Sequence, residues 1–455
     1  MPASHDRARN HLQSIATGLS PEETARRLAP KLDASPPRVP LATQTSEAVV
    51  EKRWALLPHL AATSTARQEI ADADSLTRHE TFARNIENFI GTIKMPVGLA
   101  GPLRVNGLCA QGDYYVPLAT TEAALVASYH RGASVVTLAG GCTALILNEG
   151  VTRAPAYAFA SLLEAGTFVQ WCLAHTEELR SVAEATTRHG RLQDFRFAIE
   201  GNHVYLIFDF TTGDASGQNM VTIATQAVCD RIAAACPVTP QYFFVESNMS
   251  GDKKASSQSL QSVRGRKVSA EVRLPRKIVQ RHLHTTPEKM VDYWRMSAVG
   301  GVLSGTIGVQ GHYANGLAAL FIACGQDAAC VSEAAVGVTR FEVGTEGELY
   351  AAVTLPNLIV GTVGGGTSLP TQRACLEILG LAGAGHARAF SEVCAAVALS
   401  GEISIIAALA AGQFTRAHAK LARGQKNGKA SVSPTPNAHS VESERAADSV
   451  GETGA

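Results

Sequence analysis

The chain has 455 residues, 45% of them apolar and 18% charged, so it can bury a large core and is too long for one compact domain. Forty basic side chains balance forty acidic ones, which excludes a global field that would recruit nucleic acid or an anionic membrane. The nine cysteines form neither a CxxC pair nor a Cys/His cluster at metal-ligand spacing, so we expect reduced thiols and no metal.

The first fifty residues are predicted to be short helices followed by a linker. Ser20 suits an N-cap, with proline next and Glu23 three residues after the cap. A proline-rich stretch, SPPRVP at 35–40, interrupts any helix. The polar N-terminus is unlike a secretory signal, and the apolar stretch 393–412 is interrupted by Glu402. We therefore expect a soluble cytoplasmic protein.

From about residue 51 the chain is predicted to be globular. Between about 155 and 245 the pattern reads strand, helix, strand, strand, helix, strand, in the segments AYAFAS, LLEAGTFVQWCLAHTEELRSVAEA, DFRFAIE, HVYLIFDF, NMVTIATQAVCDRIAAAC and QYFFVES. This order is typical of a ferredoxin-like unit, four antiparallel strands backed by two helices. We predict an α+β fold in which this small domain is inserted into a large one, 51–154 and 246–423. Residues 424–455 are polar and are expected to be disordered.

The stretch from Phe208 to Lys254 contains two features that suit an anionic ligand. A turn at 213–217 separates a strand from a helix that is predicted to begin near Asn219, and free amide hydrogens at a helix start can hold phosphates. An ordinary turn capped by Asp214 or Ser216 explains the same residues. The pair of lysines that follows can equally be a solvated surface feature.

Six motifs, spread over most of the chain in a fixed order, are more specific. They are ENFIGTIKMPVGLAGPL (87–103), TTEAALVASYHRG (120–132), TTGDASGQNM (211–220), SGDKK (250–254), GQDAA (325–329) and GTVGGGTSLPTQRACLEILG (361–380). Together they resemble the 3-hydroxy-3-methylglutaryl-CoA (HMG-CoA) reductase family over about 51–421, in particular its NADPH-dependent class I type. The resemblance implies an inserted small cofactor-binding domain, in agreement with the pattern at 155–245.

The resemblance assigns four catalytic residues. Reducing a thioester to an alcohol takes two hydride transfers, and it needs a cation for the developing oxyanion, a proton donor and an acid for the leaving thiolate. Lys253 matches the cation, and Asp327 the aspartate that links it to the catalytic glutamate, Glu122. That glutamate is expected to be buried and protonated. His418 matches the histidine that protonates the CoA thiolate from a C-terminal flap.

Plainer interpretations of these residues stay open from the sequence alone. Glu122 suits the first turn of a helix that begins at Thr120 or Thr121, where the helix dipole favours a carboxylate. Asp327 can cap the next helix, although an isolated carboxylate in so apolar a segment would be better explained by burial with a lysine partner. His418 can be an ordinary exposed helix histidine.

The resemblance also implies binding residues. For the hydroxymethylglutaryl group and its surroundings they are Arg153, Asn248, Asp252, Lys254 and Asn315, of which Asn315 is expected to bond the glutamate or the lysine. For the cofactor they are Arg188, Asp214, Gly217, Asn219 and Met220. No GxGxxG follows a strand, so a Rossmann site is not indicated. The guanidinium of Arg188 would pair with a 2′-phosphate, which favours NADPH over NADH.

Some positions depart from the family pattern. Glu246 stands where many relatives have a substrate-contacting serine, Lys94 replaces a common proline, and Gly424 replaces a serine that is phosphorylated in animal relatives. We interpret the chain as an enzyme that reduces (S)-HMG-CoA to mevalonate and CoA with two NADPH, acting as a homodimer or higher homo-oligomer with its site at the subunit interface. The alternatives are NAD-dependent mevalonate oxidation in catabolism and a non-catalytic homologue that binds CoA esters.

Overall fold

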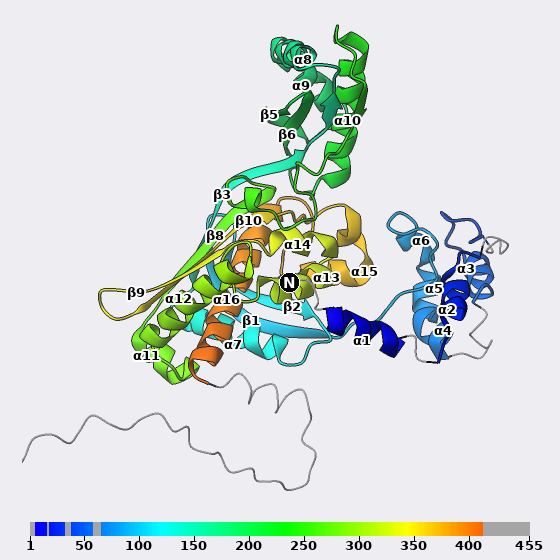
Figure 1. Cartoon of the computed structure of the whole chain (residues 1–455). Coiled ribbons are helices and arrows are strands. Elements are labelled where there is room, and N and C mark those ends of the chain that lie inside the picture. Colours follow the sequence, from blue (N-terminus) through cyan, green and yellow to red (C-terminus); the bar gives the residue numbers. More distant parts are fainter. Residues whose placement is uncertain (1–4, 16–17, 32–37, 58–64, 413–455) are drawn as a thin grey trace, which may run out of the picture.

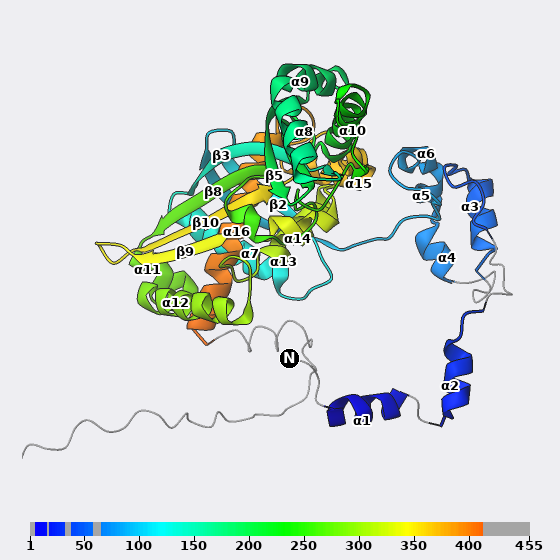
Figure 2. The same ribbon diagram turned by 45° about the horizontal axis from the view of Figure 1, so that its top comes forward.

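The computed structural model describes residues 5–15, 18–31, 38–57 and 65–412, and all structural statements concern these residues. The N-terminal helices lie beside the main body in both views (Figures 1 and 2); they are α1 (His5–Ile15), α2 (Pro21–Leu28), α3 (Glu47–Trp54), α4 (Thr65–Ile70), α5 (Ala73–Thr77) and α6 (His79–Phe82). The predicted cap of α2 is confirmed, because the Ser20 hydroxyl accepts the Glu23 amide and the Glu23 carboxylate accepts the Ser20 amide. A small separate core joins Val50, Trp54 and Phe89.

The described residues form one 10-stranded sheet, and the part of it in the body of the protein has the strand order β2, β1, β3, β8, β10, β9. Their bounds are β1 (Val97–Gly107), β2 (Gln111–Ala119), β3 (Cys142–Arg153), β8 (Gly265–Leu274), β9 (Val338–Val343) and β10 (Leu349–Leu358). Neighbours are antiparallel except β1 and β3, which pair in parallel over three residues. Buried and less buried residues alternate along β8 and most of β10, as expected for a sheet with one covered face.

Helices pack against this sheet: α7 (Leu125–Leu138), α12 (Pro287–Ser304), α13 (Tyr313–Ala323) and α16 (Ala387–Ala410). Between them run α11 (Arg276–Ile278), α14 (Val331–Ala334) and α15 (Pro370–Ile378). Helices α7 and α16 approach closely because Gly132 has no side chain; a Cβ there would lie 1.9 Å from the Ser400 carbonyl oxygen. Among the described helices α16 is long and apolar enough to cross a membrane, but 83% of its apolar window is buried in the protein, as in a core helix.

A smaller unit projects from one end of the body (Figure 1). Its strands are β4 (Ala156–Ala158), β5 (Arg191–Glu200), β6 (His203–Thr211) and β7 (Tyr242–Phe244), in the antiparallel order β7, β4, β6, β5, with helices α8 (Leu162–Ala174), α9 (Thr176–Ala185) and α10 (Gln218–Ala235). Strand β3 connects the two units, since Thr143–Gly150 pairs with β8 and Val151–Arg153 pairs with β6.

Two predictions about helices are wrong. The segment predicted as one helix over 162–185 is two, α8 and α9, because His175 leaves the helical conformation and contacts the Trp171 carbonyl through Nδ1 at 2.8 Å. The helix predicted to begin at Thr120 or Thr121 begins at Leu125, because Ala124 has a left-handed backbone with φ 72°. Glu122 therefore lies in the turn before α7 and not in the first turn of the helix.

Candidate active site

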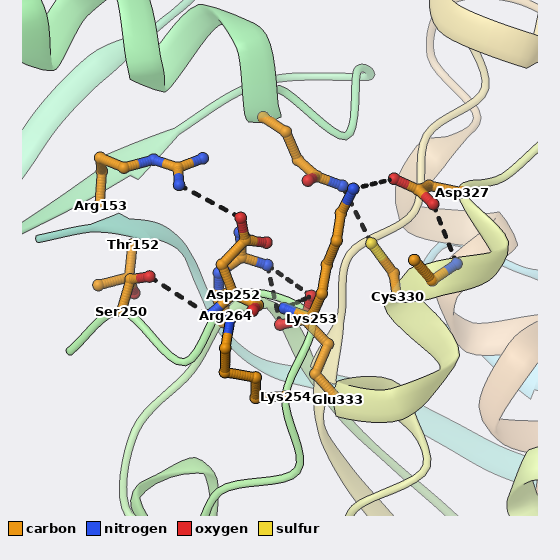
Figure 3. A network of polar contacts seen from close by, with 12 residues as sticks. Thr152, Arg153, Ser250, Asp252, Lys253, Lys254, Arg264, Asp327, Cys330 and Glu333 are labelled. Carbon is orange, nitrogen blue, oxygen red and sulfur yellow. Dashed lines mark hydrogen bonds and ion pairs between the residues drawn. The ribbon is translucent and has the colours of Figure 1, made fainter. Parts of the chain in front are cut away.

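The loop that carries Lys253 brings the predicted lysine and aspartate together. The side chains of Lys253 and Asp327 point toward one another (Figure 3). Lys253 Nζ lies 2.7 Å from Asp327 Oδ2, and the two side chains are 40% and 41% exposed. The hydrogen bond that Lys253 donates to Asp327 raises the pKa of Lys253, so the side chain is an ammonium at neutral pH. Asp327 also accepts the Ala329 amide at 3.0 Å, which caps a short 3₁₀ helix. Both interpretations of Asp327 thus describe real contacts, but its predicted burial is wrong.

The loop backbone is held in an unusual shape. Asn248 and Lys253 have positive φ values of 65° and 55°, in a region where a lysine costs about 1–2 kcal/mol. The Lys253 amide donates to the carboxylate of Glu333 at 3.2 Å, and the Asn248 amide donates to Glu246 at 2.7 Å. Lys254 Nζ donates to the Asp252 carbonyl at 2.9 Å. Glu333 follows Asp327 by six residues, so one segment positions Lys253 at both its amide and its ammonium group.

A series of ion pairs between acidic and basic side chains holds this loop. Asp252 bridges two buried arginines, with Oδ2 at 3.2 Å from Arg153 and Oδ1 at 2.7 Å from Arg264. Arg264 in turn pairs with both oxygens of Glu333, at 2.7 and 2.8 Å, and Glu333 is fully buried. Burial raises the pKa of Glu333, and the Arg264 charge opposes that rise. At the other end Arg153 lies 3.0 Å from Glu246.

The position of Arg153 follows from the course of β3. It is the last residue of that strand, at the point where β3 leaves the large sheet and pairs with β6. Its guanidinium is 7% exposed and is already engaged by Glu246 and Asp252. The predicted substrate arginine is therefore in the site, at the junction of the two units, but it is not a free cation.

Glu122 and Asn315 form a second pair. Asn315 Nδ2 lies 3.3 and 3.4 Å from the two oxygens of Glu122, so the predicted contact with the glutamate is present. Glu122 is exposed in this chain, contrary to the expected burial. The fully buried carboxylate of Glu402 fixes the start of α13 by accepting the amides of Gly311 and His312, both at 2.8 Å.

The two pairs stand at opposite ends of α13. Asn315 is in the first turn of this helix of 11 residues, which spans roughly 16 Å. Asp327 follows its last residue by four positions. Within the described part of the chain no hydrogen bond or ion pair joins Glu122 to Lys253 or Asp327. His418, the fourth predicted catalytic residue, lies outside the described residues.

The predicted cofactor turn is built around the start of α10. Gly217 is buried with φ 75°, and a Cβ there would lie 2.2 Å from the Thr212 side chain. Asp214 does not cap α10; its carboxylate accepts the amides of Gly385 and Ala387 at 2.8 and 3.2 Å, at the start of α16. This leaves the first amides of α10 without helical acceptors, as at any helix start.

Side chains predicted for the cofactor surround this turn. Asn219 is exposed and Met220 is half-buried in the first turn of α10. The Thr187 hydroxyl lies 3.0 Å from Met220 Sδ, so the loop that carries Arg188 packs against the turn. Arg188 itself is exposed and makes no ion pair with another described residue. Its position suits a ligand that binds at the start of α10 and carries a further negative group near Arg188.

Sequence reasoning missed Arg264 and Glu333. A signal for Glu333 was available, since it lies in the apolar segment ACVSEAAVG, where an isolated carboxylate needs a partner just as Asp327 does. Arg264 lies in VRGRK after the lysine loop, and nothing in its sequence surroundings distinguishes it from a surface arginine. Only the fold brings these two side chains together, from positions 69 residues apart.

The fold and the site define a class of protein, an α+β enzyme with a charged site at the junction of a large and a small unit. The model of the family described as hydroxymethylglutaryl-coenzyme A reductase matches residues 49–423. The chain belongs to this family of oxidoreductases.

Relatives and solved structures agree with this assignment. The 3-hydroxy-3-methylglutaryl-coenzyme A reductase of Pyrococcus abyssi is 43% identical over 357 residues, which are 77% of this chain and 87% of that protein. The reductase of the same name from Aeropyrum pernix is 46% identical over 352 residues, 76% of this chain and 83% of that one. The class II reductase of Streptococcus pneumoniae, solved with NADPH, shares the fold with a TM-score of 0.59 at 19% identity, over 90% of this chain and 97% of that one.

Proposed function

We propose that this protein reduces HMG-CoA to mevalonate and free CoA with two NADPH, in the formation of isoprenoids. The observation that carries the proposal is the Lys253–Asp327 pair at 2.7 Å, in a chain 43–46% identical to proteins named for this activity. The substrate-binding residues we propose are Arg153, Asn248, Asp252, Lys254 and Asn315, and those for the cofactor are Arg188, Asp214, Gly217, Asn219 and Met220.

The chemistry assigned to the site follows from its charges. Bound nicotinamide supplies the two hydrides. The Lys253 ammonium stabilises the oxyanion that forms at the thioester carbonyl and later at the aldehyde, and Asp327 keeps this ammonium in place. Glu122 provides the proton for the reduced oxygen, oriented by Asn315. His418 protonates the CoA sulfur once the carbon–sulfur bond has broken.

The small unit is the cofactor domain in this proposal. The order β7, β4, β6, β5 with antiparallel neighbours supports a ferredoxin-like domain at about 155–245, inserted between 51–154 and 246–423 of the substrate domain. The turn at Gly217 and the exposed Arg188 fit a nucleotide that carries a 2′-phosphate. Because Asp214 already caps α16, we assign it the role of holding this turn.

We also propose that two or more chains complete the site. In one chain Glu122 is exposed and stands apart from Lys253, so a second subunit would supply the missing contact and the burial that a proton-donating glutamate needs. Sedimentation velocity checks this, because a monomer would return a mass of 47.8 kDa. We further propose a cytoplasmic location, since all nine cysteine thiols are free.

Loss of NADPH absorbance on addition of HMG-CoA tests the proposed reaction, with NADH in parallel. We expect about two NADPH oxidised per CoA released, and a fall in kcat of about 100- to 1,000-fold in Lys253→Ala, the cost of removing one oxyanion donor. Lys277→Ala, an exposed lysine of α11, is the matched control and should keep wild-type rates. Preference for NADH would favour mevalonate oxidation, and ligand binding without turnover would favour a non-catalytic homologue.

A further inference from the structure

Glu246 is the last carboxylate in the series of ion pairs that holds the loop of Lys253. Its Oε2 lies 3.0 Å from Arg153 Nη1, and both its oxygens lie 3.0 Å from the Ser250 hydroxyl. Its remaining contact is the Asn248 amide at 2.7 Å. Arg153 is thus the charged partner of Glu246, and the side chain brings one full negative charge to that guanidinium.

The charges around the loop balance. The carboxylates are Glu246, Asp252, Asp327 and Glu333, and the basic groups are Arg153, Arg264, Lys253 and Lys254. An acyl group with its own carboxylate would therefore enter a site without surplus positive charge. Removing Glu246 would leave each of the other three carboxylates with its basic partner. Without the Glu246 charge the site would therefore have one surplus positive charge.

Glu246 and the carboxylate of a bound acyl group would compete for Arg153. It is buried, and its Nη1 serves both Glu246 and Asp252, while Nε has no hydrogen-bond partner among the described residues. Asp252 is also bonded to Arg264 and so cannot move without breaking a second buried contact. Glu246 has uncharged alternatives in Ser250 and the Asn248 amide. It is the carboxylate that a ligand can compete with or displace.

We propose that Glu246 is a specificity-determining residue, an internal carboxylate that competes with the carboxylate of the substrate acyl group for Arg153. This inference rests on the proposed function, because it takes the acyl group to be hydroxymethylglutaryl. It predicts that the protein binds this acyl group, which carries one free carboxylate, more weakly than the same site would without the Glu246 charge. The contacts to Ser250 and Asn248 give Glu246 a second effect, on the shape of the loop.

Two variants separate charge from shape. Glu246→Gln keeps the length and an oxygen that can accept the Asn248 amide, but it removes the charge; Glu246→Asp keeps the charge and shortens the reach. We expect Glu246→Gln to lower the KM for HMG-CoA by about three- to tenfold, the size of a partly screened charge contact, without changing the KM for NADPH. The calorimetric Kd of free 3-hydroxy-3-methylglutarate should fall by the same factor. Glu246→Asp should show neither decrease.

A control variant shows whether the loss of any exposed carboxylate has the same effect on KM and Kd. Glu342→Gln removes an exposed carboxylate paired with Arg340 at 3.0 Å on β9 and should leave both constants unchanged. An unchanged or raised KM and Kd in Glu246→Gln, with an active wild type, would overturn the inference and leave the proposed function intact. A change in thermal stability alone would reduce Glu246 to a structural role. A wild type that neither binds the free acid nor oxidises NADPH would overturn the proposed function together with the inference.

Discussion

Replacing Arg264 by methionine should destabilise the protein strongly. The methionine keeps the length and apolar volume of the arginine stem, but it leaves the carboxylates of Glu333 and Asp252 without the guanidinium that now lies 2.7 Å from each. Glu333 is 0% exposed and Arg264 is 3% exposed, so the Glu333 carboxylate would lose its ionic partner in a buried environment. Breaking a buried pair by removing one member costs about 3–5 kcal/mol of unfolding free energy, because a buried charge remains uncompensated.

The loss should depend on pH in a defined direction. Burial raises the pKa of Glu333 above the ordinary value of 4.5, and Arg264 opposes this rise, so the variant raises the folded-state pKa further. A carboxyl whose folded pKa exceeds its unfolded pKa binds its proton more tightly in the folded state, so acidification favours folding. The loss of unfolding free energy in the variant should therefore be largest above the raised pKa of Glu333. It should become smaller as the pH falls toward 4.5.

Urea unfolding followed by far-UV circular dichroism at several pH values measures this deficit. Arg340→Met is the matched control, because Arg340 pairs with Glu342 at 3.0 Å but both side chains are more than half exposed. That variant should lose about 0–1 kcal/mol, with little dependence on pH. The double variant Arg264→Met with Glu333→Leu should recover part of the loss, since no buried charge is left at position 333. A deficit below about 1 kcal/mol, or one that does not change with pH, would refute the reasoning.

Two further predictions concern the proposed cofactor turn, and a third variant, in α8, is the control for the first. In Gly361→Ala the new Cβ would lie 2.6 Å from the Ser216 amide nitrogen and 2.8 Å from the Asp214 carbonyl oxygen, so urea unfolding should show a loss of about 1–3 kcal/mol. Gly166→Ala, a helical glycine of α8 with nothing within 4 Å, should instead gain about 0.5–1 kcal/mol. In Arg188→Ala the KM for NADPH should rise about tenfold or more while that for NADH stays within twofold, in steady-state assays; an equal effect on both cofactors would show that Arg188 does not contact a 2′-phosphate.

Local sequence signals predicted the elements well where one physical cause dominates. The cap at Ser20 and the start of α10 near Asn219 depend on neighbouring residues and were recognisable. The two errors, the start of α7 and the single helix over 162–185, have nonlocal or conformational causes. Ala124 adopts a left-handed backbone that no alanine prefers, and only its surroundings can impose this conformation. His175 interrupts a continuous apolar pattern that favours one long helix.

For the site as well, the sequence identifies individual residues, and the fold shows which of them are in contact. The motifs identified Lys253, Asp327 and Glu122, and the resemblance added Asn315. The structure pairs Lys253 with Asp327 and Glu122 with Asn315. The same reasoning assigned Arg153 to the substrate without its ion pairs, because a sequence shows a charge without showing what already neutralises it. Glu246 and Asp252 lie 93 and 99 residues away along the chain, and β3 delivers Arg153 to both by leaving the large sheet for β6. If Arg153 binds the substrate as we propose, the electrostatics of binding depend on a contact between distant segments. The departure at Glu246, visible in the sequence only as a substitution, then has a physical meaning, because its partner is Arg153.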